Sequence, residues 1–179
     1  MLQYAAPMGL KQWAEIYCLY QKAFPKSEKK PFLIILRKFR EGKTDIWRFT
    51  RAGSFAGMVI TINGDQHILI DYLAVAESRR GTGIGSEILR RMQAHYAGKG
   101  VFLEIESVYE ECGNKAERLR RKHFYERAGM QSMGVFVWLF GVKMELMSFG
   151  AKLTYEEYHA FYRENYGQWA AEHIQSAEK

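Results

Sequence analysis

A glycine-rich stretch, RRGTGIGSEIL, runs from Arg79 to Leu89. Its glycines, Gly81, Gly83 and Gly85, alternate with other residues just before a helix-like pattern. Glycine lets backbone N–H groups approach a ligand closely, and the N-terminus of a helix adds a dipole that favours negative charge. The chemistry that this stretch predicts is therefore the binding of an anion such as a phosphate.

Spacing separates the known phosphate-binding designs. A P-loop requires a lysine and then a serine or threonine after its final glycine, whereas Ser86 and Glu87 follow Gly85 here, which excludes it. A dinucleotide fingerprint requires glycines at relative positions one, three and six, directly after a strand, but AESRR separates these glycines from the apolar run YLAV. That design stays an alternative, because Glu104 lies at about the distance of a ribose-binding acid.

The composition predicts one globular domain of 179 residues, since 47% of the residues are hydrophobic and only three are proline. No apolar run is long enough to span a bilayer, and the N-terminus lacks the pattern of an export signal. We therefore expect a cytoplasmic location and no membrane partner. The net charge of +6 agrees with an anionic ligand.

The metal-binding side chains show no ligand spacing. Cys18 and Cys112 are too few for a disulfide framework and too far apart for a metal site, and the five histidines are scattered. We expect reduced cysteines and no metal.

The elements that must position the glycine stretch can be predicted from periodicity and turn residues. Apolar residues at intervals of three and four predict helices, and β-branched and aromatic runs between turn residues predict strands. The first half of the chain is expected to form a helix from Leu10 to before Pro25, a helix from Pro31 to near Gly42, and three antiparallel strands within Asp45–Val75. The second half is expected to form a helix from Ser86 to about Ala97, a strand at Val101–Ser107, a helix within Asn114–Gly129 and a hairpin around Gly141. A last helix is expected to begin with the capping box of Thr154 and Glu157.

The stretch LAVAESRRGTGIGSEILRRM resembles the coenzyme A loop of the GCN5-related N-acetyltransferases (GNAT). The signature of that loop is arginine or glutamine, two residues, glycine, one residue, then glycine or alanine, and Arg80, Gly83 and Gly85 match it. Downstream, FYERAGM is similar to the second pattern of the family, with Tyr125 and Gly129 in the matching places. The order of the predicted elements also agrees with that family over most of the chain.

The resemblance implies an α+β fold, in which helices flank a mixed, mostly antiparallel central sheet. It implies a single domain over residues 1–179, with the core at about 8–150 and a C-terminal helical extension at about 154–179 that lies outside the likeness. The implied activity is an acetyl-CoA-dependent N-acyltransferase that moves the acetyl group directly to a primary amine of a small molecule or peptide.

The resemblance also implies where acetyl-CoA lies. The cofactor would rest against the end of the fourth strand, in a splay between strands four and five, with its pyrophosphate on the glycine loop. A backbone N–H near Val75 would steady the oxyanion, and the guanidinium of Arg80 would add charge. The implied cofactor-binding residues are Leu73, Ala74, Val75, Arg80, Gly81, Thr82, Gly83, Ile84, Gly85 and Ser86.

Tyr125 would be the general acid of such a transferase. It would protonate the departing thiolate, which is a tolerable leaving group because a thiol has a pKa of about 8.5, so the hydroxyl helps without being indispensable. The sequence departs from the family at one place. Many members carry an asparagine seven residues before this tyrosine, where this chain has Arg118, and Asn114 is the nearest asparagine.

Carboxylates provide the candidate general base, because an amine with a pKa of about 10.4 arrives mostly as ammonium. Glu104 and Glu106 lie on the same side of the predicted fifth strand, and Glu106, nearer its end, is the first choice. Glu110 and Glu111 belong to the same acidic cluster, and Asp71 on the fourth strand is a reserve candidate.

The basic run ERLRRKHF offers no nucleic-acid site, because acids flank it and no aromatic residues interleave with its charges. Arg121 or Lys122 could instead attract the 3′-phosphate of the cofactor, and His123 is expected to be an ordinary helix residue. Two other functions stay open: a non-catalytic acyl-CoA sensor on the same fold, and an NAD-dependent oxidoreductase. The sequence leaves open whether the protein is a monomer or a homodimer.

Overall fold

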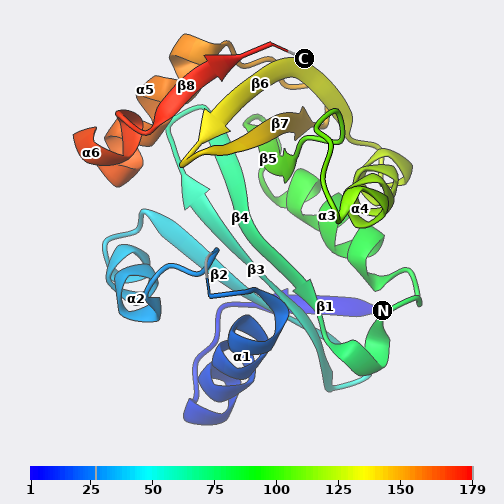
Figure 1. The fold of residues 1–179 in the computed structure, drawn as a ribbon. Coiled ribbons are helices and arrows are strands. Elements are labelled where there is room, and N and C mark those ends of the chain that lie inside the picture. Colours follow the sequence, from blue (N-terminus) through cyan, green and yellow to red (C-terminus); the bar gives the residue numbers. More distant parts are fainter. Residues whose placement is uncertain (27, 179) are drawn as a thin grey trace. The chain divides into compact units, whose positions relative to one another are not determined.

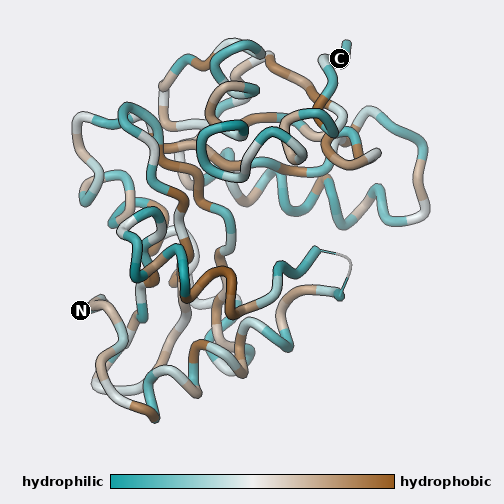
Figure 2. Tube along the Cα trace, turned by 90° about the vertical axis from the view of Figure 1, so that its left-hand side faces the viewer, coloured by the Kyte–Doolittle hydropathy of each residue, from teal (hydrophilic) through white to brown (hydrophobic). Residues whose placement is uncertain are grey.

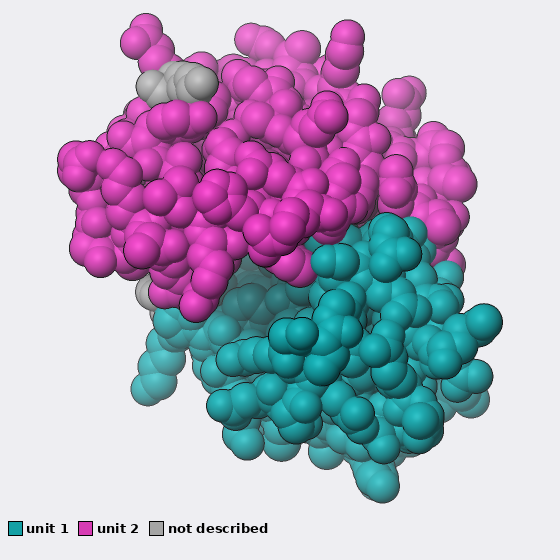
Figure 3. Space-filling model, turned by 90° about the vertical axis from the view of Figure 1, so that its right-hand side faces the viewer, with its two compact units in different colours: residues 1–63, 70–91 teal, residues 64–69, 92–179 magenta. Residues whose placement is uncertain are grey.

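The computed structural model describes residues 1–26 and 28–178 and divides into two compact units. The first unit comprises Met1–Asn63 and Ile70–Arg91, and the second comprises Gly64–Leu69 and Met92–Lys179 (Figure 3). One strand, β4 (His67–Val75), begins in the second unit and ends in the first.

The first unit carries the N-terminal, antiparallel strands of the sheet and the glycine loop (Figure 1). Its elements, besides the end of β4, are β1 (Leu2–Ala5), α1 (Leu10–Ala23), α2 (Phe32–Arg40), β2 (Thr44–Arg51), β3 (Ser54–Asn63), the 3-10 turn η1 (Glu77–Arg79) and most of α3 (Ile84–His95). Strands β1 and β3 both pair with β2 in antiparallel register, and helices α1 and α2 pack beside β3 and β2.

The second unit combines one parallel and several antiparallel pairings. Its elements, besides the start of β4, are β5 (Gly100–Glu106), α4 (Lys115–Arg127), β6 (Gln131–Leu139), β7 (Val142–Ser148), α5 (Tyr155–Tyr166), α6 (Gln168–Ala171) and β8 (Ile174–Ala177). The start of β4 runs parallel to β5, and β5 pairs antiparallel with β7. Strand β6 pairs antiparallel with both β7 and β8.

The strand order is β1-β2-β3-β4-β5-β7-β6-β8, a mixed and mostly antiparallel sheet with helices beside it. This confirms the predicted α+β class. Hydrophobic residues concentrate along the strands (Figure 2), and in the first unit Ile16 and Tyr20 of α1 pack into the same buried cluster as Met58 of β3 and Tyr72 of β4. The spacing of three and four thus predicts the buried face of α1 at Ile16 and Tyr20, whereas Leu10 and Tyr17, which share that spacing, are exposed.

The structure confirms most predicted elements and differs from the prediction at the start of α3, at β1 and at β8. Helix α3 begins at Ile84 rather than Ser86, because Ile84 is buried and the carbonyl of Gly83 accepts the hydrogen bond from Glu87. Strand β1 was not predicted, since four residues are too few for a periodic signal. The C-terminal stretch, expected to be helical throughout, ends in strand β8, where pairing with β6 satisfies its backbone.

The capping box at the start of α5 is confirmed. The hydroxyl of Thr154 accepts a bond from the Glu157 N–H, and the Glu157 carboxylate accepts one from the Thr154 N–H at 2.8 Å. None of the helices in the described part of the chain has the length and apolar character needed to cross a membrane.

Candidate active site

The glycine loop connects η1 to α3 and presents a row of free backbone donors. The N–H groups of Arg79 and Arg80 bond to the carbonyls of Ala76 and Glu77, which closes the turn. Beyond this turn, the N–H groups of residues 81–86 find no acceptor among the described residues. These donors point to an anionic ligand, because the first turn of a helix leaves its N–H groups without internal partners.

The loop conformation depends on glycine. Gly81 and Gly83 have φ angles of +75° and +77°, a region that other residues enter only with strain, and a side chain at either place would meet open space. The Thr82 hydroxyl donates to the Arg79 carbonyl at 2.7 Å and closes the loop on itself. Arg80 is exposed, and its Nε lies 3.4 Å from the Val75 carbonyl, so the guanidinium stays beside the end of β4.

Packing within the first unit fixes the start of α3. Glu87 in its first turn pairs with Arg51 of β2 and, at 3.2 Å, with Arg91 one turn later. Although burial acts to raise the pKa of Glu87, the bonds from these two arginines outweigh it and lower that pKa. Ile88 of α3 lies 3.1 Å from the place of a Cβ on Gly57 of β3, so α3 sits directly on the sheet.

The end of β4 carries the other predicted cofactor residues of the first unit. Ala74 is buried, whereas Leu73 and Val75 are partly exposed. A Cβ at Gly57 would lie only 2.6 Å from the Ala74 carbonyl, so the backbone of β3 approaches β4 as closely as glycine allows.

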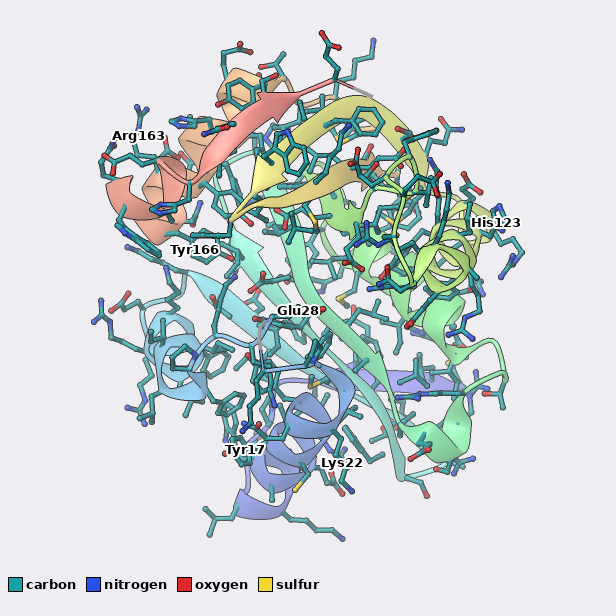
Figure 4. All side chains as sticks on the ribbon, in the orientation of Figure 1. Tyr17, Lys22, Glu28, His123, Arg163 and Tyr166 are labelled. Atoms are coloured by element: carbon teal, nitrogen blue, oxygen red, sulfur yellow. The ribbon has the colours of Figure 1, made fainter. Side chains whose placement is uncertain are left out.

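Asp71, the reserve base, is bound by a lysine. The ammonium of Lys30 contacts both carboxylate oxygens of Asp71 at 2.8 Å. Tyr72, on the opposite side of β4, bonds through its hydroxyl to the carbonyl of Glu28, a residue of the segment between α1 and α2 (Figure 4). These bonds tie that segment to β4 and occupy Asp71 with an internal cation.

In the second unit, Glu106 is bound by two guanidinium groups. Arg118 donates to one oxygen at 2.9 Å and Arg121 to the other at 2.5 Å. Arg118 also donates to the Ser107 carbonyl at 3.0 Å, so this arginine connects α4 to the end of β5. Both carboxylate oxygens of Glu106 thus already accept charge-assisted bonds from α4.

Glu104 has a different environment. One of its oxygens, Oε1, accepts hydrogen bonds from the hydroxyls of Tyr158 and Tyr162, each at 2.8 Å. Both tyrosines come from α5 and both are buried. These two donors are neutral, in contrast to the guanidinium groups at Glu106.

Tyr125 lies on α4 and is partly buried. Burial raises the pKa of its hydroxyl, and the nearby charge of Arg121 opposes this to a smaller extent. Within the part of the chain that the structure describes, the Tyr125 hydroxyl makes no hydrogen bond. The group therefore keeps its proton at neutral pH and is free to donate it to a ligand.

The remaining charged candidates of the second unit are engaged in ion pairs. Lys122 is buried and bonded to Glu145 at 2.7 and 2.8 Å, so the expectation that it attracts a cofactor phosphate is wrong. Two further acids of the cluster are also paired, Glu110 with Lys143 at 2.8 Å and Glu111 with Lys115 at 2.6 Å.

Two further residues of this region have ordinary places. Asn114 is the N-cap residue of α4 and makes no side-chain capping bond. His123 is exposed on the same helix (Figure 4), as expected. Among residues 1–26 and 28–178, no cluster of histidine, cysteine and acidic side chains could hold a metal ion.

The comparison with known families decides the class of protein. Residues 13–130 match the Acetyltransferase (GNAT) family, and this stretch includes the glycine loop, Glu104, Glu106, Tyr125 and Gly129. The chain belongs to the GNAT family. The resemblance inferred from Arg80, Gly83 and Gly85 is thereby confirmed.

Individual relatives of this GNAT chain agree with that assignment. The Bacillus subtilis (strain 168) protein YjbC, provisionally named an acetyltransferase, is 30% identical over 121 residues, which cover 58% of this chain and 62% of YjbC. The match thus spans less than two thirds of that relative. Its name describes YjbC alone.

Solved structures share the GNAT fold. A Bacteroides thetaiotaomicron protein provisionally assigned to the GNAT family superposes with a TM-score of 0.72 at 20% identity, over 93% of this chain and 98% of that one. Spermidine N-acetyltransferase from Vibrio cholerae, in complex with CoA and spermine, gives a TM-score of 0.63 at 13% identity, over 82% and 94%. The alternative of an NAD-dependent oxidoreductase is wrong, because its sheet would be continuously parallel, whereas this GNAT sheet is mostly antiparallel.

Some residues of this GNAT chain that shape the site were not predicted. Tyr158 and Tyr162 lie outside the family match, and only their spacing of four, which places them on one face of a helix, was a signal. Gly57 gave no signal in the sequence, since a single glycine within a strand has several explanations.

Proposed function

We propose that this GNAT chain is an N-acetyltransferase that moves the acetyl group of acetyl-CoA directly to a primary amine of a small molecule or peptide. The observation that carries the proposal is the row of N–H donors at residues 81–86, beside Arg80 and at the start of α3, for which the described residues offer no acceptor. A pyrophosphate carries the negative charge and the acceptor oxygens that such a row binds. CoA is the ligand that the spermidine relative holds.

The cofactor-binding roles rest on the first unit. The loop N–H groups and Arg80 would bind the pyrophosphate, and the pantetheine arm would lie against Leu73, Ala74 and Val75. A backbone N–H near Val75 would donate to the carbonyl oxygen as negative charge develops on it.

The proton-transfer roles rest on the second unit. Tyr125 would give its proton to the leaving thiolate, which agrees with its raised pKa and with a hydroxyl that no described residue occupies. A carboxylate of β5, directly or through a water, would take the proton of the ammonium. We place Glu104 before Glu106 in this role, because the guanidinium groups of Arg118 and Arg121 bind both oxygens of Glu106.

We further propose that the chain works as one acetyltransferase domain in the cytoplasm. The spermidine relative supports a cationic amine as acceptor, because its solved complex contains spermine beside CoA. An amine screen that follows release of free thiol would identify the acceptor.

The first experiment is a calorimetric titration of the protein with acetyl-CoA, and separately with NAD. The variant Gly83→Asp tests the loop, since it places a carboxylate among the donors at a φ of +77°. The matched control is Gly53→Asp, because Gly53 has a φ of +74°, also faces open space and lies in the turn between β2 and β3.

Acetyl-CoA should bind the protein and the Gly53→Asp variant alike, and Gly83→Asp should weaken this binding by at least about tenfold. Binding of NAD in place of acetyl-CoA, or equal loss in both variants, would contradict the proposal. Binding of acetyl-CoA without thiol release for any amine would identify an acyl-CoA sensor on the same fold.

A further inference from the structure

Helix α5 follows the part of the chain that matches the GNAT family, which ends at residue 130. The capping box of Thr154 and Glu157 fixes where this helix starts. Positions 158 and 162 then lie four residues apart on one face, so their side chains point the same way. The start of the helix thus determines which pair of side chains α5 presents to the sheet.

The tyrosines at these positions reach one carboxylate oxygen. Both hydroxyls donate to Oε1 of Glu104 at 2.8 Å, from residues 54 and 58 positions later in the chain. Tyr158 is 0% exposed and Tyr162 is 3% exposed, whereas Glu104 is partly exposed, so both donors are buried at the edge of a carboxylate that solvent can reach. Bonds of this kind to a charged oxygen are stronger than bonds between neutral groups.

The surroundings hold the two tyrosines in place. Their rings lie 4.9 Å apart, and the ring of Tyr158 packs on Phe102, two residues before Glu104 on the same face of β5. Phenylalanine would fill the same space, so packing alone does not account for the hydroxyls. What the hydroxyls add is a pair of bonds to Glu104.

We propose that Tyr158 and Tyr162 are positioning residues, which hold Glu104 as the acceptor of the amine proton and set the pH range in which it works. This rests on the proposed function. Two donors fix the direction of the carboxylate, and they stabilise its charged form without adding positive charge themselves.

Several elements of the second unit place side chains near Glu104. Glu106 lies two residues along the same face of β5 and is paired with Arg118 and Arg121 of α4. Leu146 of β7, directly opposite Glu104, is apolar. On α5 the next residue of the same face is Tyr166 (Figure 4), whose ring lies 4.8 Å from that of Tyr162. His67, at the start of β4, lies with its ring 6.4 Å from that of Phe102.

The test is the dependence of kcat/KM on pH for the protein, Tyr158→Phe, Tyr162→Phe and the double variant, with acetyl-CoA and the amine found by the screen. Each lost hydroxyl removes a bond to the charged carboxylate, so Glu104 takes up its proton at higher pH. The acidic limb of the kcat/KM profile should therefore move to higher pH, by about one pH unit or more in the double variant. Tyr155→Phe is the matched control, since its hydroxyl on the same helix bonds to the Ile174 carbonyl at 3.2 Å.

A second measurement does not need turnover. In protein labelled with ¹³C at glutamate carboxyl carbons, the Glu104 signal is assigned with Glu104→Gln and titrated in each variant. The expected result is that the midpoint of this titration moves to higher pH in the tyrosine variants and stays unchanged in Tyr155→Phe. If thiol is released but neither the acidic limb of the pH profile nor the titration of the Glu104 signal moves in the tyrosine variants, this inference alone is overturned. If no amine causes thiol release, the proposed function is overturned.

Discussion

The ammonium of Lys122 on α4 and the carboxylate of Glu145 on β7 form an ion pair at 2.7 Å, and Glu145 is fully buried. The side chain of Lys122 also lies over the ring of Tyr109, with 5.0 Å between the nitrogen and the ring centroid. A buried pair of this kind joins a helix to the sheet, and removal of one partner leaves the other charge without compensation.

Loss of one partner should destabilise the protein more than loss of both. Glu145→Gln or Lys122→Met should lower the free energy of unfolding by about 3–5 kcal/mol, whereas the double variant that combines Lys122→Met with Glu145→Leu should recover much of that loss. Urea denaturation of the single and double variants measures this. Equal losses in the single and double variants would contradict it.

The same pair predicts how stability falls at high pH. Burial acts to lower the pKa of Lys122, but the bonds to Glu145 outweigh it and raise that pKa above its usual range. Because the pKa of Lys122 is higher in the folded than in the unfolded protein, its charge adds to the free energy of unfolding. This contribution is fully present below the unfolded pKa of about 10.4 and is lost as pH rises through the folded pKa. The melting temperature of the protein should therefore fall more steeply between about pH 9 and about pH 11.5 than that of the same double variant, which lacks both charges. Thermal unfolding over this pH range measures the difference.

Gly57 should be needed at the end of β4, where we propose that acetyl-CoA lies. Gly57→Ala places a Cβ 2.6 Å from the Ala74 carbonyl, so β3 or β4 must shift. We expect a loss of about 1–3 kcal/mol in stability and weaker binding of acetyl-CoA. Gly113→Ala is the control, because Gly113 has open space around it and an ordinary φ. Calorimetry with acetyl-CoA and thermal unfolding check both effects, and unchanged affinity in Gly57→Ala would argue against the predicted place of the cofactor.

Tyr125→Phe tests the general acid. Turnover should fall by roughly 10²-fold or less, with acetyl-CoA binding intact, because the thiolate is already a tolerable leaving group. Since burial raises the pKa of Tyr125, loss of turnover from ionisation of this hydroxyl should begin at a higher pH than it would for an ordinary tyrosine. Unchanged turnover in Tyr125→Phe would remove this residue from the mechanism.

Glu104→Gln and Glu106→Gln should affect different quantities. Glu104→Gln should lower kcat by about 10²- to 10⁴-fold, the usual range for a general base. Glu106→Gln should chiefly lower the melting temperature, because Arg118 and Arg121 lose their charged partner. Steady-state kinetics and thermal unfolding measure kcat and the melting temperature of both variants. A larger loss of kcat in Glu106→Gln than in Glu104→Gln would make Glu106 the general base.

The sequence by itself determined the parts of this protein that depend on a few neighbouring residues. The glycine loop is one such part, since Gly81 and Gly83 have positive φ angles just before α3, and glycine is the residue that adopts such angles without strain. The capping box of α5 is another, because Thr154 and Glu157 satisfy each other's backbone within one turn. These features follow from spacing, and spacing is visible in the sequence.

Only the tertiary structure decided which partner each carboxylate has. Asp71 with Lys30, Glu106 with Arg118 and Glu104 with Tyr158 are separated by 41, 12 and 54 positions. Such pairs depend on which apolar faces of helices and strands pack together, and many packings satisfy the same hydrophobic pattern. The sequence therefore pointed to the acids of β5, whereas the packing of α4 and α5 against the strand decided that arginines bind Glu106 and tyrosines bind Glu104.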